Sequence, residues 1–462
     1  MQEKTLTTDH PLSRMLMVFY GLPHLTHAIV ALPLALFIPS YYADELALPM
    51  ASVGLAIAAS RLLDIISDPV VGIISDRLQT RWGRRKPWLA LGTPLLILSA
   101  WMVFVPGEGI SVAYLFGWTS LLYLAYTFVD LPYKAWGAEL STHYSERSRV
   151  TAWREAFGAF GQILFLGTLM AMALKDITDV RLQLLAIAIL IVISQPLLVT
   201  VTLWKVPERM PEVLAGSEQT ISKGWQALAL LGKNRAFLRT LAAVVLFGTA
   251  VLMQATLHRF VLNHIVKAPD LFAPMILAEN IGSILCLPLW IWISDHIGKH
   301  RAVSLAALWI ALWSVFLPVV GEGDSVLYVT LILLRGSSLA SIFFLSSSIG
   351  ADVVDYDTVV SGKQRTGLYF SVWGMASKLS IGLGVVLGTS LPAFFGFNPA
   401  ETTHTAAAIS SLMVIYGWLP CLILVLGVPF LWNFPIDKKH QQELRNKITA
   451  ALMVEDLSST GK

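Results

Sequence analysis

Twelve long apolar segments constrain this chain more than any other feature of its sequence. Each can form a helix of roughly 20 residues, the length that crosses the hydrocarbon core of a bilayer. Such a segment crosses as a helix, because lipid offers the backbone no hydrogen-bond partners. We expect these helices at residues 15–41, 50–75, 87–106, 111–138, 150–174, 182–204, 237–262, 271–294, 302–320, 326–350, 366–394 and 406–433.

The composition agrees with a chain that lies mostly in a lipid bilayer. Hydrophobic residues make up 55% of the 462 residues and charged residues only 14%, whereas soluble domains carry about 25% charged residues. A soluble globule is therefore excluded. The formal net charge is +3, and the cations gather in short loops, so we expect no nucleic acid partner.

The sequence carries no motif of an enzyme or of a bound cofactor. Neither GxSxG nor HExxH occurs. The two cysteines, Cys286 and Cys421, lie in apolar segments without the spacing of a disulfide framework or a metal site. The polar N-terminus lacks the basic and apolar regions of a signal peptide, so we expect the first apolar segment to be retained.

Basic residues predict how the chain is oriented. The loop after the second segment is crowded with Arg77, Arg81, Arg84, Arg85 and Lys86, whereas the loops PGEGIS and GEGDS contain no cation. By the positive-inside rule the crowded side is cytoplasmic, and an even number of spans then places both termini in the cytoplasm. We expect a bacterial inner-membrane protein in which these loops serve topology and packing.

The chain divides into two similar halves. SDRLQTRWGRR follows the second segment and SDHIGKHR follows the eighth, and the longest polar stretch lies between the halves. This arrangement is typical of the major facilitator fold, which places a substrate site between its halves near the bilayer midplane. We predict a six-helix bundle at 1–205, a cytoplasmic linker at 206–235, a second bundle at 236–435 and a cytoplasmic tail at 436–462.

Ionisable side chains inside the apolar segments are the main candidates for function, because each costs roughly 2.5–3.5 kcal/mol at the centre of a membrane helix. Arg61, Asp64 and Asp68 share one face of the second segment. Two carboxylates at close range resist joint ionisation, and a bound Na⁺, a proton or an arginine relieves their repulsion. The alternative is an Arg61–Asp64 pair that merely locks the helices together.

A third carboxylate, Asp130, lies within the fourth segment. Pro132 frees a backbone carbonyl one turn earlier, which can also serve a cation. Because hard cations such as Na⁺ prefer several oxygen ligands, we predict a cation site shared by Asp64, Asp68 and Asp130. A local pair between Asp130 and Lys134 is the alternative, and the two are compatible.

Several polar and aromatic residues are candidates for binding the solute. On the fifth segment, Arg154 and Glu155 are expected to point to opposite sides, with Arg154 either gripping the solute or pairing with a buried aspartate. Aromatic residues either stack on a sugar or simply pack. The predicted solute-binding residues are Arg154, Lys134, Lys378, Tyr133, Trp373 and His27.

The second half carries charges near the end of its fourth segment. We predict that Asp352, Asp355, Asp357 and Arg365 form a charge network that opens and closes a gate. Lys378 lies deep in the next segment and is expected to reach the acidic group of the first half. The sequence suggests no role for His258, Arg259, Glu279 and Arg335.

RLLDIISDPVVGIISDRLQTRWGRRKPW, DLPY and ADVVDYDTVVSGKQRTG together resemble the glycoside, pentoside and hexuronide cation symporters, a melibiose-permease-like group of the major facilitator superfamily. The resemblance extends over essentially the whole chain. It implies that Asp64 and Asp68 bind the coupling Na⁺, Li⁺ or H⁺. It also implies that Asp130, Arg154 and Lys378 match functional positions on the fourth, fifth and eleventh helices.

Two departures from the resembled family concern the sugar site. The first helix offers His24, Thr26 and His27 where the permease has an acidic residue, and Lys134 replaces a tryptophan four residues after the fourth-helix acid. We expect cation-coupled symport of a sugar or glycoside-like solute by alternating access. The alternatives are a proton-coupled or lysolipid-type carrier of the same fold and, further away, a membrane-embedded enzyme, a channel or a sensor.

Overall fold

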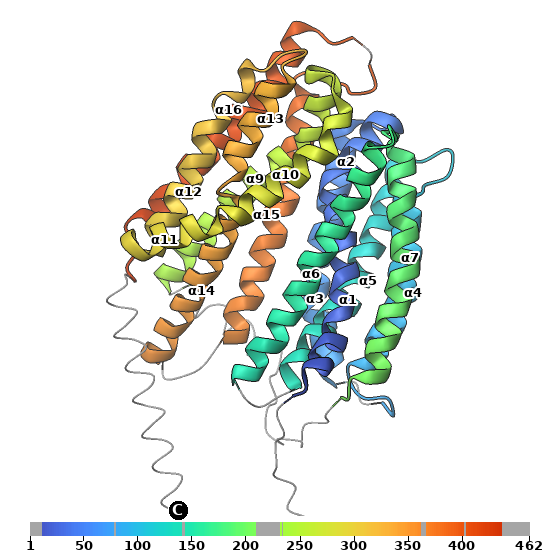
Figure 1. Cartoon of the computed structure of the whole chain (residues 1–462), viewed down its shortest axis with the longest axis vertical. Helices are drawn as coiled ribbons and strands as arrows, with labels where there is room; N and C mark the ends of the chain where they lie inside the picture. The colour runs from blue at the N-terminus through green and yellow to red at the C-terminus, as the bar shows by residue number, and fades with distance from the viewer. Residues whose placement is uncertain are drawn as a thin grey trace, which may run out of the picture. The chain divides into compact units, whose positions relative to one another are not determined.

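The computed structural model describes residues 12–77, 80–140, 144–208, 232, 234–361, 366–401 and 403–436. Within these ranges the chain is helical, and twelve helical segments are long and apolar enough to cross a membrane (Figure 1). The twelve spans expected from the apolar segments are therefore confirmed. The predicted tail lies outside the described residues beyond Ile436, and so does most of the predicted linker.

The chain forms two compact units. The first contains the described residues of Met1–Leu34 and Leu62–Ala215. Its helices are most of α1 (Arg14–Leu36), the second part of α3 (Met50–Arg77), α4 (Lys86–Phe104), α5 (Val112–Glu139), α6 (Tyr144–Ala173) and α7 (Val180–Lys205). Within this unit α4 packs on both α5 and α7.

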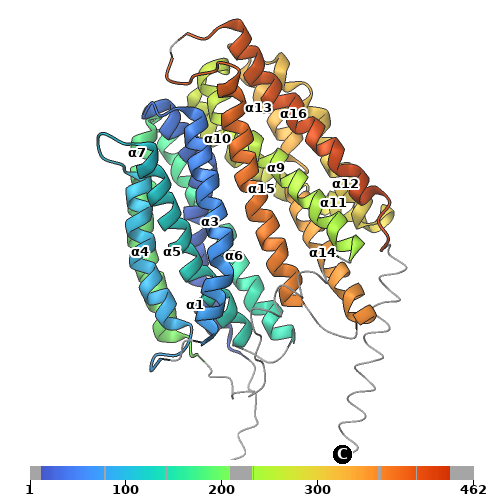
Figure 2. The same cartoon turned by 180° about the vertical axis from the view of Figure 1, so that it is seen from behind.

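The second unit contains the described residues of Ala35–Arg61 and Gly216–Lys462, so the division falls inside α3. Its central helix, α9 (Arg235–Val261), packs against α15 (Thr366–Phe394) and α16 (Ala406–Trp432) (Figure 2). The other elements are α2 (Ile38–Ser40), η1 (Tyr41–Glu45), η2 (Leu262–Val266), η3 (Pro269–Leu271), α10 (Phe272–Leu285), α11 (Leu287–Ile297), α12 (Lys299–Ser314), η4 (Leu317–Val319), α13 (Ser325–Gly336), α14 (Leu339–Ser361), α15 (Thr366–Phe394) and α16 (Ala406–Trp432).

Local chemistry sets where several of these helices begin and end. Ser111, Asp179, Asn234 and Thr405 are N-caps whose side chains accept a hydrogen bond from a backbone N–H in the first turn. The eighth span is not a single helix: α10 ends at Leu285 and α11 follows with a proline in its first turn. Proline has no N–H to continue the hydrogen-bond ladder, which accounts for a break there.

Large apolar side chains are exposed on helices of both units. Leu91 and Ile193 in the first unit and Leu285 and Leu422 in the second each expose more than half of their surface. A soluble protein rarely exposes so many apolar groups. We infer that lipid covers these helix faces.

The basic loop of the first unit packs against acidic side chains. Both Arg84 and Arg85 donate to Glu139 Oε1, at 2.8 and 2.7 Å. Glu208 accepts the backbone N–H groups of residues 84–86 at the N-terminus of α4, where the helix dipole favours an anion. These contacts give the loop a packing role within its unit.

A buried polar network joins five helices of the second unit. Arg335 of α13 is 2% exposed and donates to Glu279 of α10 at 2.5 Å and to Gln254 of α9 at 2.6 Å. His258 Nδ1 lies 2.6 Å from the Tyr416 hydroxyl of α16, and Gln254 donates to Ser314 of α12. The sequence alone suggests no role for Glu279, Arg335 and His258, and the structure places all three in this network.

We predict that Glu279→Ala destabilises the protein by about 3–5 kcal/mol, because it leaves the Arg335 guanidinium buried without its carboxylate. Glu322→Ala is the matched control, since Glu322 forms an exposed pair with Lys267 at 2.8 Å and such a pair contributes about 0–1 kcal/mol. Thermal unfolding of the purified variants measures the difference. Equal melting temperatures for the two variants would show that the buried network does not stabilise the unit.

Candidate functional site

Asp64 and Asp68 meet at one hydroxyl group. Both lie on α3, and Thr127 of α5 places its Oγ1 2.8 Å from Asp64 Oδ1 and 2.9 Å from Asp68 Oδ1. Asp64 is 4% exposed and Asp68 is half-buried. A hydroxyl carries a single proton, so Thr127 donates to one carboxylate at a time and keeps lone pairs for a further contact.

The sequence alone predicted a role for Asp64 and Asp68 but none for Thr127. Its signal was present, since Thr127 lies three residues before Asp130 on the same helix face. We call Asp64, Asp68 and Thr127 the acidic notch. It belongs entirely to the first unit and contains two carboxylates and a hydroxyl, which are the ligand types that hard cations prefer.

Asp130 lies in a different set of contacts. Its Oδ2 pairs with Lys134 Nζ at 2.7 Å, and its Oδ1 lies 3.8 Å from His27 Nδ1. Among the described residues, the ligand atoms of Asp130, His24 and His27 approach one another within 4.8 Å, and those of Asp64 and Asp68 do not join this group. The local Asp130–Lys134 pair is therefore present, and a cation shared with the acidic notch stays a prediction.

Arg154 of α6 pairs with its own neighbour. Its Nη2 lies 2.6 Å from Glu155 Oε1, and Glu155 Oε2 lies 3.7 Å from His24 Nε2. The expectation that Arg154 and Glu155 point to opposite sides is wrong, because both long side chains bend toward each other. Arg154 and Glu155 of α6 and His24 of α1 therefore form a row of polar side chains between the two helices.

Tyr133 packs α5 against α1. Its hydroxyl donates to the Tyr20 carbonyl at 2.5 Å, and the Tyr20 hydroxyl donates to the Tyr133 carbonyl at 2.9 Å. The two rings stack with centroids 4.7 Å apart, and both residues are almost fully buried. In this structure, packing uses both the ring and the hydroxyl of Tyr133.

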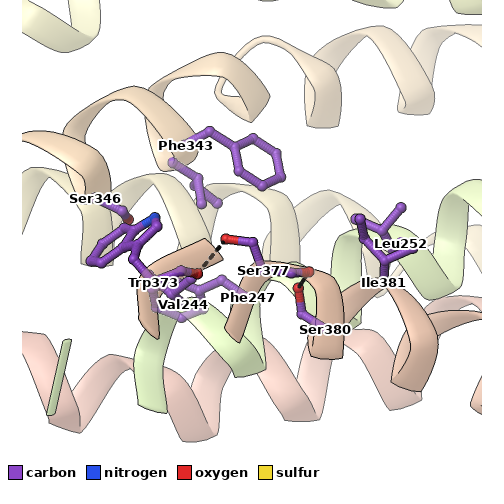
Figure 3. A pocket seen from close by; sticks show the side chains of 11 residues that line it. Val244, Phe247, Leu252, Phe343, Ser346, Trp373, Ser377, Ser380 and Ile381 are labelled. Carbon is purple, nitrogen blue, oxygen red and sulfur yellow. Dashed lines mark hydrogen bonds between the residues drawn. The ribbon is translucent and has the colours of Figure 1, made fainter. Parts of the chain in front are cut away.

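Trp373 lines a cavity of about 320 Å³ within the second unit (Figure 3). Side chains of α9, α14 and α15 surround it, and most are apolar, including Phe247 and Phe343. The hydroxyls of Ser377 and Ser380 donate to backbone carbonyls of their own helix. Ser346 Oγ is buried and has no hydrogen-bond partner within the described parts of the chain.

The remaining predicted residues lie elsewhere in the second unit. Asp352 of α14 pairs with Lys299 of α12, with Nζ 2.7 and 3.0 Å from the two carboxylate oxygens. Asp355 and Asp357 are half-buried on the same helix, and Lys378 is half-buried on α15. Arg365 lies outside the described residues, so the gate network stays a prediction.

Comparison with known proteins gives related sequences and a related fold. The glucuronide carrier protein homolog of Escherichia coli is 25% identical to this chain, with 89% of this chain and 90% of the relative covered. The sodium-dependent lysophosphatidylcholine symporter 1 of Mus musculus is 22% identical, with 96% and 89% covered. A D-xylose-proton symporter superposes with a TM-score of 0.64 at 14% identity, over 91% of this chain and 96% of that chain.

The sequence also matches a protein family over nearly its whole length. Residues 19–438 match the family described as MFS/sugar transport protein. The twelve membrane-spanning helices and the superposition give the same fold. The chain therefore belongs to the family of MFS/sugar transport proteins, and it is a multi-pass secondary active transporter of the major facilitator fold and not an enzyme.

Proposed function

We propose that this protein is a symporter that moves a sugar or glycoside-like solute together with Na⁺, Li⁺ or H⁺. The observation that carries the proposal is the acidic notch, in which Thr127 contacts both Asp64 and Asp68. The protein would lie in the inner membrane of a bacterium with both termini in the cytoplasm, as the distribution of its basic residues predicts.

The notch has the chemistry of a cation site. Two carboxylates that share one hydroxyl repel each other when both are charged. A cation removes this repulsion and gains oxygen ligands at the same time. The half-buried position of Asp68 leaves the site open to an entering ion, while Asp64 forms its buried end.

Cation binding would drive solute accumulation. A membrane potential contributes about 2.3 kcal/mol per charge per 100 mV, which corresponds to roughly 50-fold accumulation at one charge per cycle. Coupling is reciprocal, so a solute that binds more tightly after the cation must tighten cation binding equally.

The cavity around Trp373 is the candidate site for part of the solute. An indole wall can stack on a sugar ring, and Ser346 offers a buried hydroxyl that has no described partner. The relation to a glucuronide carrier homolog supports a glycoside, in which a sugar is joined to a second group. The second candidate is a lysolipid, favoured by the largely apolar lining and by the relation to a lysophosphatidylcholine symporter.

We predict that Asp64→Asn and Asp68→Asn each abolish concentrative, ion-driven uptake, because an amide cannot balance the charge of the cation. Uptake into proteoliposomes under an imposed ion gradient and potential measures this effect. Glu322→Gln is the control, since this exposed carboxylate pairs with Lys267 far along the sequence from the notch. Uphill uptake that persists in both Asn variants would place the coupling site elsewhere.

Thr127→Val removes the hydroxyl that joins the two carboxylates. Hydrogen bonds to charged groups contribute about 1.5–3 kcal/mol, so we expect the half-saturating cation concentration to rise by about tenfold or more. Thr119→Val is the matched control: Thr119 lies two turns earlier on α5, and its buried hydroxyl has no hydrogen-bond partner among the described residues. Cation titration of uptake measures both, and equal responses would remove Thr127 from the site.

A screen of solutes separates the two candidate classes. A ligand that binds only the folded protein and is present at a concentration of 100 times its Kd stabilises the protein by about 2.7 kcal/mol. A thermal-shift measurement detects this stabilisation. We expect glycosides to raise the melting temperature only when the coupling cation is present. Ser346→Leu, which fills the cavity, should remove this shift, whereas Ser346→Ala should retain most of it. A cation-independent shift with lysolipids alone would favour the second candidate.

A further inference from the structure

Two histidines and an aspartate form a compact group in the first unit. His24 and His27 lie on successive turns of α1, and Asp130 faces them from α5. One ligand atom from each residue lies within 4.8 Å of the other two. His27 is fully buried and Asp130 is 6% exposed, so the group is largely shielded from water.

Several polar atoms of this group have no partner among the described residues. His24 Nδ1, both ring nitrogens of His27 and Asp130 Oδ1 are buried and form no hydrogen bond within the described residues. A buried polar atom without a partner is costly, and native structures rarely contain several together. All three side chains contribute such atoms, so one bound ion or molecule could provide a partner for each of them.

The spacing fits a bound ion better than a direct hydrogen bond. His27 Nδ1 and Asp130 Oδ1 are 3.8 Å apart, which is too long for a hydrogen bond. Two ligands that bind the same Zn²⁺ ion at about 2.0–2.2 Å lie at a comparable separation. Imidazole nitrogens and a carboxylate oxygen are also the ligands that zinc and related divalent ions use.

Neighbouring residues leave the right atoms available. Glu155 Oε2 lies 3.7 Å from His24 Nε2, which leaves Nδ1 of the same ring for a ligand. Lys134 uses Asp130 Oδ2, so Oδ1 remains available, and the lysine side chain is 45% exposed and free to turn outward.

We propose that His24, His27 and Asp130 bind one divalent transition-metal ion of the zinc type. The ligand atoms are His24 Nδ1, one ring nitrogen of His27 and Asp130 Oδ1, and the fourth position is left to water or to an oxygen of a bound solute. This site is distinct from the acidic notch and holds a different class of ion, with mixed nitrogen and oxygen ligands instead of oxygen ligands alone.

Cobalt(II) is the probe for the test, because its visible absorption reports the ligands around it. The full-length protein in nanodiscs is expected to bind one Co²⁺ with the absorption of a four-coordinate ion, and Zn²⁺ should displace it. His24→Ala and His27→Ala should each weaken binding at least tenfold. His296→Gln, which changes an exposed histidine of α11, is the matched control and should bind as the unchanged protein does.

Two further variants give readouts that a loss of folding cannot imitate. His27→Cys replaces the imidazole by a thiolate, which also binds metal ions, so bound Co²⁺ should gain the intense near-ultraviolet band of a cobalt thiolate. The unchanged protein also contains two cysteines, Cys286 and Cys421, but it should lack this band. Lys134→Gln removes a competing cation beside Asp130 and should tighten binding several-fold. Absence of Co²⁺ binding to the unchanged protein, or a folded His27→Cys variant without the thiolate band, overturns the proposal. Neither result bears on coupling through Asp64 and Asp68.

Discussion

The cost of placing charge in lipid governs the arrangement of polar side chains in this structure. Most buried carboxylates are held by a cation on the same or a neighbouring helix: Asp130 by Lys134, Glu279 by Arg335 and Asp352 by Lys299. Asp64 and Asp68 in addition share one neutral hydroxyl, that of Thr127. A transported cation that occupies the notch during each cycle would lower the repulsion between the two carboxylates.

The two kinds of buried charge have different consequences for transport. The Arg335 network is held by Gln254, His258 and Tyr416 as well as by Glu279, so it favours one fixed arrangement of five helices. The acidic notch offers the oxygen ligands that a hard cation prefers. An ion that binds there changes the local charge on α3 and α5, and it shifts a conformational equilibrium by the difference between its affinities for the two states.

The sequence was sufficient for the twelve spans, because each depends on the length and polarity of one continuous segment. It was also sufficient for Asp130 and Lys134, whose contact follows from helical spacing. Three sets of contacts could not be predicted from the sequence, because they form between helices that are distant in it. They are the contact of Thr127 with the two carboxylates, the Arg335 network, and the group of His24, His27 and Asp130. Arg154 and Glu155 were misjudged because the direction of a Cβ does not fix where a long side chain ends.

Equilibrium binding of radioactive Na⁺ to the purified protein shows whether a cation occupies the acidic notch, because it detects the ion without requiring the solute to be known. Where the coupling ion is a proton, a measurement of proton uptake by the purified protein takes the place of Na⁺ binding. The account predicts one bound cation per chain, lost in Asp64→Asn and weakened in Thr127→Val. Stoichiometric binding that is unchanged in Asp64→Asn would contradict the account and leave the acidic notch with a structural role.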